Sequence, residues 1–224
     1  MADSVLTLDG DPKKAEVVKA LFEDLMEAIA CQEKDDRQYN RRNLVRVFFA
    51  VVEGIVSWIK GEALSFVKFG NTQWTPDVLA MLREEEYGIR QNGKAFTRQK
   101  FIPTEVNLRF IIDLLAGIGP TPGPEISGVG WQAFKRCVEI RNRITHPKIT
   151  GALLVNDDEI ACTKTAMDWF KGFLAHYIVA VIAYAYSKAS DEQKSVLAKA
   201  LQESGAPPDI LTKSHKANSG GEAK

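Results

Sequence analysis

One long apolar stretch, residues 41–69 (RRNLVRVFFAVVEGIVSWIKGEALSFVKF), limits most strongly what this chain can fold into. Apolar residues recur in it at intervals of three and four, the spacing of one face of an α-helix: Leu44, Phe48, Val52, Ile55 and Ile59. The middle of the stretch is apolar nearly all round, so we expect a central helix that begins near Asp36. Glu53 interrupts the stretch, which therefore lacks the roughly 18–20 continuous apolar residues of a membrane span.

Helical periodicity also governs most of the remaining chain. Further helices are expected at five places: from Asp11, from Pro76 to Glu86, from Pro103, over 131–146, and from about Asp158 to Ser187. The last of these contains FLAHYIVAVIAYAY, which is also too short an apolar run to cross a membrane and is interrupted by His176. Between the helices, residues 87–102 contain Asn92-Gly93, the strongest short-range signal for a β-hairpin.

The expected fold class is therefore all-α, a helical bundle with a small β-hairpin insertion at about 87–102. We expect four segments: a flexible N-terminus (1–10), a helical domain (11–189), an accessory helix (190–204) and a disordered C-terminal tail (205–224). The acidic segment REEEYG (83–88) is expected to be a charged helix end on which no other candidate residue converges.

The composition narrows the classes of protein. The chain has 224 residues, with 29 Lys and Arg against 29 Asp and Glu, so its formal net charge is zero. This balance argues against a basic coat for non-specific nucleic-acid binding, although it allows a local basic patch. The three cysteines are far apart and form no CxxC pair, so neither a metal site nor a cofactor is expected. Sparse cysteines and the lack of a signal-peptide pattern predict a cytoplasmic protein.

Arg141 stands at an unexpected position in the helix WQAFKRCVEIRNRITH, residues 131–146. It belongs to a stripe with helical spacing that is otherwise mainly apolar: Trp131, Phe134, Val138, Arg141 and Thr145. A guanidinium group does not lose its proton, and burying it unpaired is very costly, so Arg141 requires an anion.

Glu53 presents the reverse problem, because it stands in an apolar stretch where an apolar residue would cost less free energy to bury. We predict that Glu53 and Arg141 are neighbours, or that both line one polar pocket in the bundle. Two alternatives remain open for this pair: a structural salt bridge without chemistry, or a site where Arg141 holds the phosphate of a ligand.

His146 follows Arg141 by five positions and stands directly before Pro147. A residue before proline is pushed out of α-helical geometry, so His146 is expected where the helix ends. There it can turn back toward Arg141. Alternatively, Arg143 and His146 only complement the negative end of the helix dipole.

The segment RNRITHP (141–147) resembles the R-x(4–6)-H motif of HEPN domains, with Asn142 as the polar residue after the arginine. Residues 41–59 resemble the arginine-led, alanine- and valine-rich helix with an inner glutamate that is found in many prokaryotic members. The resemblance covers about Asp11 to Ser187. It implies a helical bundle that dimerises, so that two motifs meet in a composite site. Catalytic members cut RNA without a metal, often in toxin–antitoxin or antiviral defence systems, whereas others only bind nucleotides, RNA or proteins.

The chemistry implied by this resemblance fits the residue types. His146 would take the proton from a ribose 2′-hydroxyl or give one to the leaving 5′-oxygen, because imidazole titrates near neutrality. Arg141 would hold the phosphate with its planar donor fork, and Asn142 would orient the phosphate or the second motif. A homodimer would supply the second histidine.

Three further residues are candidates for a supporting role in this site: Glu53, Arg143 and Thr145. The sequence leaves open whether Arg141 or Arg143 faces the site. Candidate contacts to the RNA backbone are Arg41, Arg42, Arg46 and Lys148. For the three arginines at the start of the central helix, a solvated helix face is the alternative interpretation.

The sequence thus predicts a metal-independent endoribonuclease of HEPN type, with RNA as substrate, a homodimeric site and an antitoxin or defence-system protein as a further partner. One alternative is a non-catalytic HEPN-like module that binds RNA, a nucleotide or a protein and dimerises. Another is an unrelated bundle in which the pair of Arg141 and Glu53 is structural. Cleavage that depends on His146 separates the first two. The third is favoured if Arg141 and His146 point to opposite sides of their helix, away from a shared interface.

Overall fold

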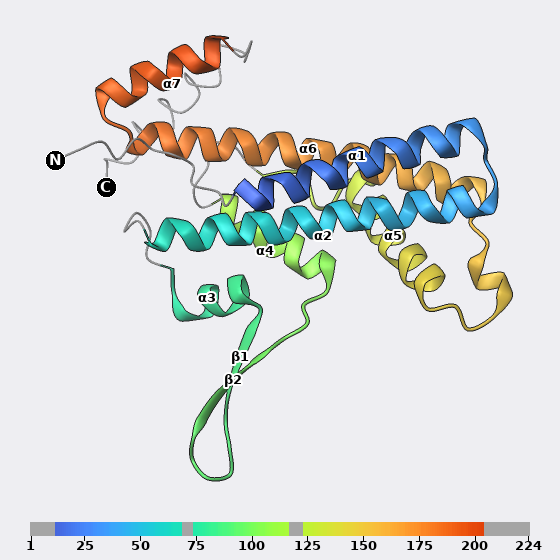
Figure 1. The fold of residues 1–224 in the computed structure, drawn as a ribbon. Coiled ribbons are helices and arrows are strands. Elements are labelled where there is room, and N and C mark those ends of the chain that lie inside the picture. Colours follow the sequence, from blue (N-terminus) through green and yellow to red (C-terminus); the bar gives the residue numbers. More distant parts are fainter. Residues whose placement is uncertain (1–11, 69–73, 117–122, 204–224) are drawn as a thin grey trace.

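The computed structural model describes residues 12–68, 74–116 and 123–203 and is drawn in Figure 1. In this part of the chain it contains seven α-helices, one short 3-10 helix and one two-stranded sheet. The predicted all-α class with a small hairpin is therefore confirmed. The predicted flexible N-terminus (1–10) and disordered tail (205–224) lie outside the described residues, as does the expected N-cap Asp11.

Helices α1 (Pro12–Lys34) and α2 (Gln38–Lys68) pack side by side (Figure 1). They approach closely at Gly54, where a Cβ would come within 2.4 Å of Leu21 Cδ1 and the Leu21 side chain would have to shift. The predicted apolar stripe of α2 is buried along its whole length: Leu44, Phe48, Val52, Ile55 and Ile59. Helix α2 is therefore the central helix that the sequence predicts.

Helices α5 (Val129–Thr145) and α6 (Asp157–Lys188) pack against each other and against α2. The 3-10 helix η1 (Thr150–Leu153) lies in the connection between them. Asn156 caps α6, because its side chain accepts from the N–H of Glu159 at 2.9 Å and the Glu159 carboxylate accepts from the N–H of Asn156 at 3.1 Å. Aromatic rings fill the core between these helices: Phe48, Phe49, Trp131, Phe134, Trp169, Phe170 and Phe173.

Helix α6 is long enough and apolar enough over Asp157–Tyr184 to cross a membrane, judged by length and composition alone. This segment is longer than the apolar run FLAHYIVAVIAYAY, which by itself is too short to cross a membrane. In the structure, 39% of its most apolar window is buried. Phe170 and Phe173 belong to the common core with α2 and α5. Part of α6 therefore packs in the core of the helical bundle.

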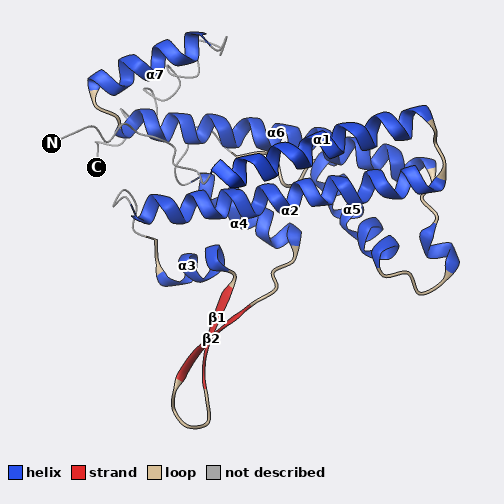
Figure 2. Ribbon diagram, viewed as in Figure 1, coloured by secondary structure: helices blue, strands red, loops and turns tan. Residues whose placement is uncertain are grey.

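A smaller unit lies in the chain between α2 and α5: α3 (Pro76–Arg83), β1 (Glu85–Ile89), β2 (Ala95–Gln99) and α4 (Thr104–Ala116). Helix α3 ends at Arg83 rather than at Glu86 as predicted, because Glu84 adopts a left-handed conformation with φ 54° and ψ 47°. The antiparallel hairpin turns at Asn92-Gly93, as predicted, and Gly93 supplies the positive φ of 75° that the turn needs. The hairpin projects away from the helices (Figure 2).

Helix α7 (Asp191–Glu203) is the predicted accessory helix and follows the C-terminal end of α6 (Figure 1). Ser190 caps it: its hydroxyl accepts from the N–H of Gln193 at 3.3 Å, and the side chain of Gln193 accepts from the N–H of Ser190 at 2.9 Å. These two bonds make Ser190 the N-cap of α7.

Candidate functional site

Arg141 lies at the edge of the buried face of α5 rather than in its middle. The predicted stripe is buried at Trp131 and Phe134 but is exposed at Thr145. In an α-helix, a residue seven positions along lies about 20° round the helix axis from the first. Over the length of α5 this rotation moves the stripe from the buried face at Trp131 to the exposed face at Thr145. The side chain of Arg141 is 27% exposed, and its Cζ lies 5.8 Å from the centroid of the Phe49 ring. The guanidinium group therefore sits on the aromatic core with one side open to solvent.

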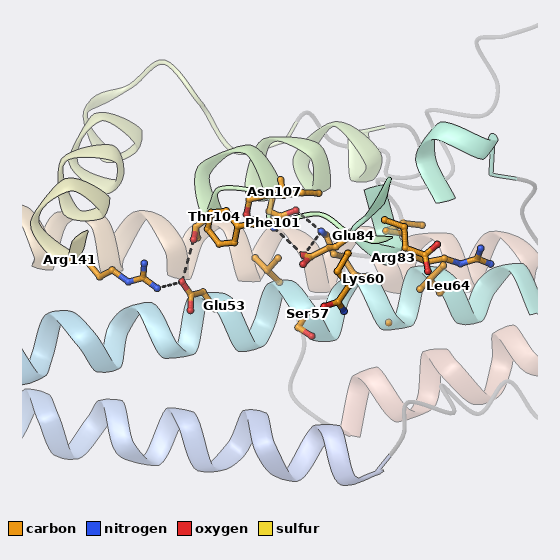
Figure 3. Close-up of a pocket in the computed structure, with 16 residues that line it drawn as sticks. Glu53, Ser57, Lys60, Leu64, Arg83, Glu84, Phe101, Thr104, Asn107 and Arg141 are labelled. Atoms are coloured by element: carbon orange, nitrogen blue, oxygen red, sulfur yellow. Dashed lines mark hydrogen bonds and ion pairs between the residues drawn. The ribbon is translucent and has the colours of Figure 1, made fainter. Parts of the chain in front are cut away.

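Glu53 of α2 is the anion that Arg141 requires. The two side chains form an ion pair, and the Thr104 hydroxyl donates to Glu53 Oε1 at 3.4 Å (Figure 3). The predicted neighbourhood of Glu53 and Arg141 is confirmed. The side chain of Glu53 is 45% exposed, so the pair borders solvent instead of being buried in the core. A pair in such a place contributes little to stability, and its charges stay accessible to a ligand.

Asn142 and His146 complete the motif at the end of α5. Arg141 Nη1 donates to Asn142 Oδ1 at 3.1 Å. His146 is the C-cap residue, and its backbone N–H donates to the carbonyl of Asn142 at 3.0 Å. Pro147 prevents the helix from continuing, as the sequence predicts. The exposed imidazole of His146 makes no hydrogen bond or ion pair within the described part of the chain.

Arg143 is held by the connection between α5 and α6. Its Nη1 donates to the carbonyls of Ala152 and Leu154, at 2.9 and 2.7 Å. Its Nη2 donates to Glu159 Oε1 at 2.6 Å. The two arginines of the motif differ in their acceptors and not in exposure: Arg143, 33% exposed, donates to two backbone carbonyls and Glu159, whereas Arg141, 27% exposed, donates to the side chains of Glu53 and Asn142. Thr145, also a candidate for support, is exposed.

Arg41 at the start of α2 is also occupied by internal acceptors. It pairs with Asp36 and Asp157, and its Nη1 donates to the carbonyl of Val155 at 3.0 Å. Gln38 exchanges two hydrogen bonds with the backbone of Val155, at 3.0 and 2.8 Å. The first turn of α2 therefore fixes the chain just before α6.

Arg42 and Arg46 contact the same connection farther along α2. Arg42 Nη1 donates to the carbonyl of Leu153 at 3.1 Å, and Arg46 Nη2 donates to the carbonyl of Ile144 at 2.9 Å. The latter carbonyl is in the last turn of α5, where no intrahelical donor is left for it. The predicted RNA-binding arginines therefore fasten the segment that carries His146, whereas Lys148 is exposed. Their contact with RNA stays a prediction.

A second charged cluster, which the sequence analysis missed, surrounds Lys60 of α2. The side chain of Lys60 is only 3% exposed. Its Nζ donates to Glu84 Oε1 at 2.8 Å and to Asn107 Oδ1, and Asn107 Nδ2 donates to Glu84 Oε1 at 3.2 Å. Burial lowers the pKa of Lys60, and the hydrogen bond that Lys60 donates to Glu84 opposes that shift. The expectation that nothing converges on REEEYG is wrong, because Glu84 leaves the helix and joins this cluster.

A cavity of about 640 Å³ joins the two clusters. Arg141 and Glu53 lie at one end and Lys60, Glu84 and Asn107 along it, with Phe101 from the base of the hairpin (Figure 3). This volume is within the range of small-molecule sites, roughly 300–1,000 Å³. His146 does not line the cavity. Five positions of an α-helix place Arg141 and His146 about 140° apart, so within one chain they do not converge on one ligand. This arrangement favours the alternative of an unrelated bundle with a structural pair of Arg141 and Glu53, unless a second copy brings the two motifs together.

No group of three or more His, Cys, Asp or Glu side chains is placed to hold a metal ion in residues 12–68, 74–116 and 123–203. Compared with known proteins, the chain matches no protein-family model, no curated protein and no solved structure.

Proposed function

We propose that this protein is a metal-independent endoribonuclease of HEPN type whose active site is completed by a second copy of the chain. One observation supports the proposal: at the end of α5, Asn142 and His146 are exposed and Arg141 donates only to the side chains of Glu53 and Asn142, whereas Arg143 donates to two backbone carbonyls and Glu159. An arginine, an amide and an unpaired imidazole are the groups that RNA transphosphorylation uses.

The reaction needs a base and an acid, which argues for two copies. His146 of one copy takes the proton of the ribose 2′-hydroxyl, and the 2′-oxygen then attacks the phosphorus. The bond from phosphorus to the 5′-oxygen breaks, and the partner subunit's His146 protonates that oxygen. Products are a 2′,3′-cyclic phosphate and a 5′-hydroxyl. The other described histidine, His176, is half-buried in α6, and burial lowers its pKa, so it is a poor source of the second imidazole.

Arg141 would bind the phosphate that gains charge in the transition state. Glu53 and Asn142 hold its guanidinium group in a fixed direction, so little ordering is needed when substrate arrives. Its other donors stay available, because the side chain is 27% exposed. Positioning by Arg42 and Arg46 would keep the end of α5 in place during the reaction.

A non-catalytic binding module is the second candidate, and the ion pair itself favours it. The charge of Arg141 is already balanced by Glu53, so a phosphate must compete with that carboxylate. The cavity beside the pair also has the volume of a small-molecule site. A role in a toxin or antiviral system and an antitoxin or defence-system partner follow from the HEPN resemblance alone, whereas a cytoplasmic location is proposed from the sparse cysteines.

The test is cleavage of RNA by purified protein in EDTA, with analysis of the product ends. We expect 2′,3′-cyclic phosphate ends from the wild type and a loss of at least about 100-fold in His146→Ala. Arg141→Ala is expected to lose a similar factor. Arg136→Ala is the matched control, because it removes an equal charge from an exposed position on the same helix.

Mixed dimers test the second copy. Because the reaction uses the imidazoles of both copies, a dimer of one wild-type and one His146→Ala chain should be nearly inactive. The activity of a random mixture should therefore fall with the square of the wild-type fraction, whereas a site within one chain would make it fall in direct proportion. Cleavage by His146→Ala at the wild-type rate would overturn the nuclease proposal. RNA binding without cleavage by folded wild type would favour the binding module.

A further inference from the structure

The β-hairpin carries a concentrated positive charge that the helical bundle does not need. From Tyr87 to Lys100 the sequence has no acidic residue, although the whole chain is neutral. Its cations are Arg90, Lys94, Arg98 and Lys100, and all four are exposed. The hairpin projects from the bundle (Figures 1 and 2), so the core does not explain these residues.

The register of the hairpin places all four cations on one face. Glu86 lies opposite Arg98, and Gly88 lies opposite Phe96. The ladder continues at both ends, since the N–H of Arg90 donates to the carbonyl of Lys94 at 2.9 Å and the N–H of Lys100 donates to the carbonyl of Glu84 at 2.7 Å. Because alternate residues of a strand share a face, the even-numbered residues form one surface. Glu86 is the acidic residue of this surface within the two strands, and Glu84 lies opposite Lys100 at its base. We call the part of the surface formed by Arg90, Lys94, Phe96, Arg98 and Lys100 the cationic face.

An aromatic ring lies in the middle of the cationic face. Cζ of Arg90 is 5.7 Å from the centroid of the Phe96 ring. The ring also crosses Gly88 on the other strand, where a Cβ would come within 2.6 Å of Phe96 Cε1. Glycine at position 88 thus lets the ring lie close against the hairpin. Of the cations, Arg98 has a counter-ion on this face, Glu86, and Lys94 and Lys100 have no ion pair within the described residues.

We propose that the cationic face of the hairpin binds the backbone of single-stranded RNA and holds it near the cavity that Arg141 and Glu53 line. Cations spaced along a ribbon match successive phosphates, and an aromatic ring among them gives an unstacked base a surface to stack on. Duplex RNA fits less well, because its major groove is deep and narrow. Pairing with the hairpin of a second copy would bring two such sets of like charges together.

The base of the hairpin connects this surface with the candidate site. Gln99 and Phe101 line the same cavity as Arg141 and Glu53. Phe101 is 85% exposed, so it offers a second ring between the hairpin and Arg141. By the same alternation Gln99 and Phe101 belong to the face opposite Lys100, so a strand on the cationic face would pass round the base of the hairpin to reach Arg141. This inference rests on RNA being the substrate, as proposed above.

The test compares two variants with the same loss of charge. One replaces Arg90, Lys94, Arg98 and Lys100 with Gln. The control replaces four exposed lysines of the helices with Gln: Lys19, Lys164, Lys171 and Lys199. Binding of a fluorescent single-stranded RNA is measured from 50 to 200 mM salt. We expect the hairpin variant to raise Kd at least about tenfold and to reduce the salt slope by about 2–3, since each phosphate contact contributes about 0.7. The control should change Kd less than about twofold.

A single change, Lys94→Gln, guards against unfolding of the hairpin, because it keeps the contacts of Arg90 with Phe96 and of Arg98 with Glu86. It should raise Kd about two- to threefold and reduce the slope by about 0.7. Equal effects of the hairpin variant and the control would overturn the proposal, as would a wild type that binds no RNA at 50 mM salt. A shift from dimer to monomer with unchanged Kd would assign the hairpin to a second copy and also overturn it.

Cleavage by the same proteins separates this inference from the nuclease proposal. If the nuclease proposal and the hairpin proposal are both correct, the hairpin variant raises KM and leaves kcat unchanged. Cleavage that needs His146 but ignores the hairpin would overturn the hairpin proposal alone. RNA binding that depends on the hairpin, without cleavage by the wild type, would support the hairpin and overturn the nuclease.

Discussion

The two sides of α5 use arginine in different ways. On the side of the α5–α6 connection, Arg42 and Arg143 donate to backbone carbonyls, and Arg143 also binds Glu159. On the side of the cavity, Arg141 contacts only side chains, Glu53 and Asn142, and borders solvent. Arginines that look alike in the sequence therefore differ in the acceptors that remain for a ligand. A guanidinium that satisfies carbonyls holds a fold together, whereas one balanced by a half-exposed carboxylate can exchange that partner for a phosphate.

The largest difference should appear between Arg143→Ala and Arg141→Ala. We expect Arg143→Ala to lower the free energy of unfolding by about 2–3 kcal/mol, because two carbonyls and Glu159 lose a charged donor. Arg141→Ala should lower it by less than about 1 kcal/mol. Urea unfolding followed by circular dichroism measures both. Equal losses of stability in the two variants would contradict the distinction between a structural Arg143 and an available Arg141.

Lys60→Met tests the buried end of the cavity. It should lower the free energy of unfolding by about 1–3 kcal/mol, because Glu84 and Asn107 keep their polar groups but lose the buried donor. The double variant Lys60→Met with Glu84→Gln should recover part of that loss, since no unpaired carboxylate remains. The double-mutant cycle in urea gives the coupling. Additive losses would show that Lys60 and Glu84 do not stabilise each other.

Arg42→Ala asks whether the arginines of α2 are structural or bind RNA, as the sequence predicts. If they only fasten the connection, unfolding should become easier by about 1 kcal/mol, because the carbonyl of Leu153 loses its donor. The Kd for single-stranded RNA and its salt slope should then stay unchanged. A slope reduced by about 0.7 would show a phosphate contact and support the RNA-binding prediction instead.

The smallest effect is expected at acidic pH. The hydrogen bond from Arg41, with a second from Gln32, holds the pKa of Asp36 at about 2, below its ordinary value of 3.8. A carboxylate with a lowered pKa stabilises the fold above its unfolded pKa, and this contribution is lost as the pH falls through about 4 to 2. The wild type should therefore lose stability between pH 4.5 and 2.5 slightly more than Asp36→Asn. Urea midpoints at both pH values provide the check, and identical changes would contradict it.

Much of the fold and half of the site were predictable. The buried stripe of α2, the hairpin turn at Asn92-Gly93 and the pairing of Glu53 with Arg141 were all predicted from local patterns and from the cost of unpaired charge. The same reasoning applied to Lys60, which interrupts the apolar run SWIKGEALSF, would have called for an anion near it. It would not have named Glu84, because the end of α3 was predicted beyond that residue.

By itself, the sequence determined the helices, their buried faces and the need of Arg141 for an anion. These follow from periodicity, from capping residues and from the cost of burying charge, all of which act over a few residues. Only the tertiary structure decided which arginine of RNRITH remains available. Arg143 meets Ala152, Leu154 and Glu159 because α6 folds back along α5, and no local pattern states which carbonyls a long side chain will reach.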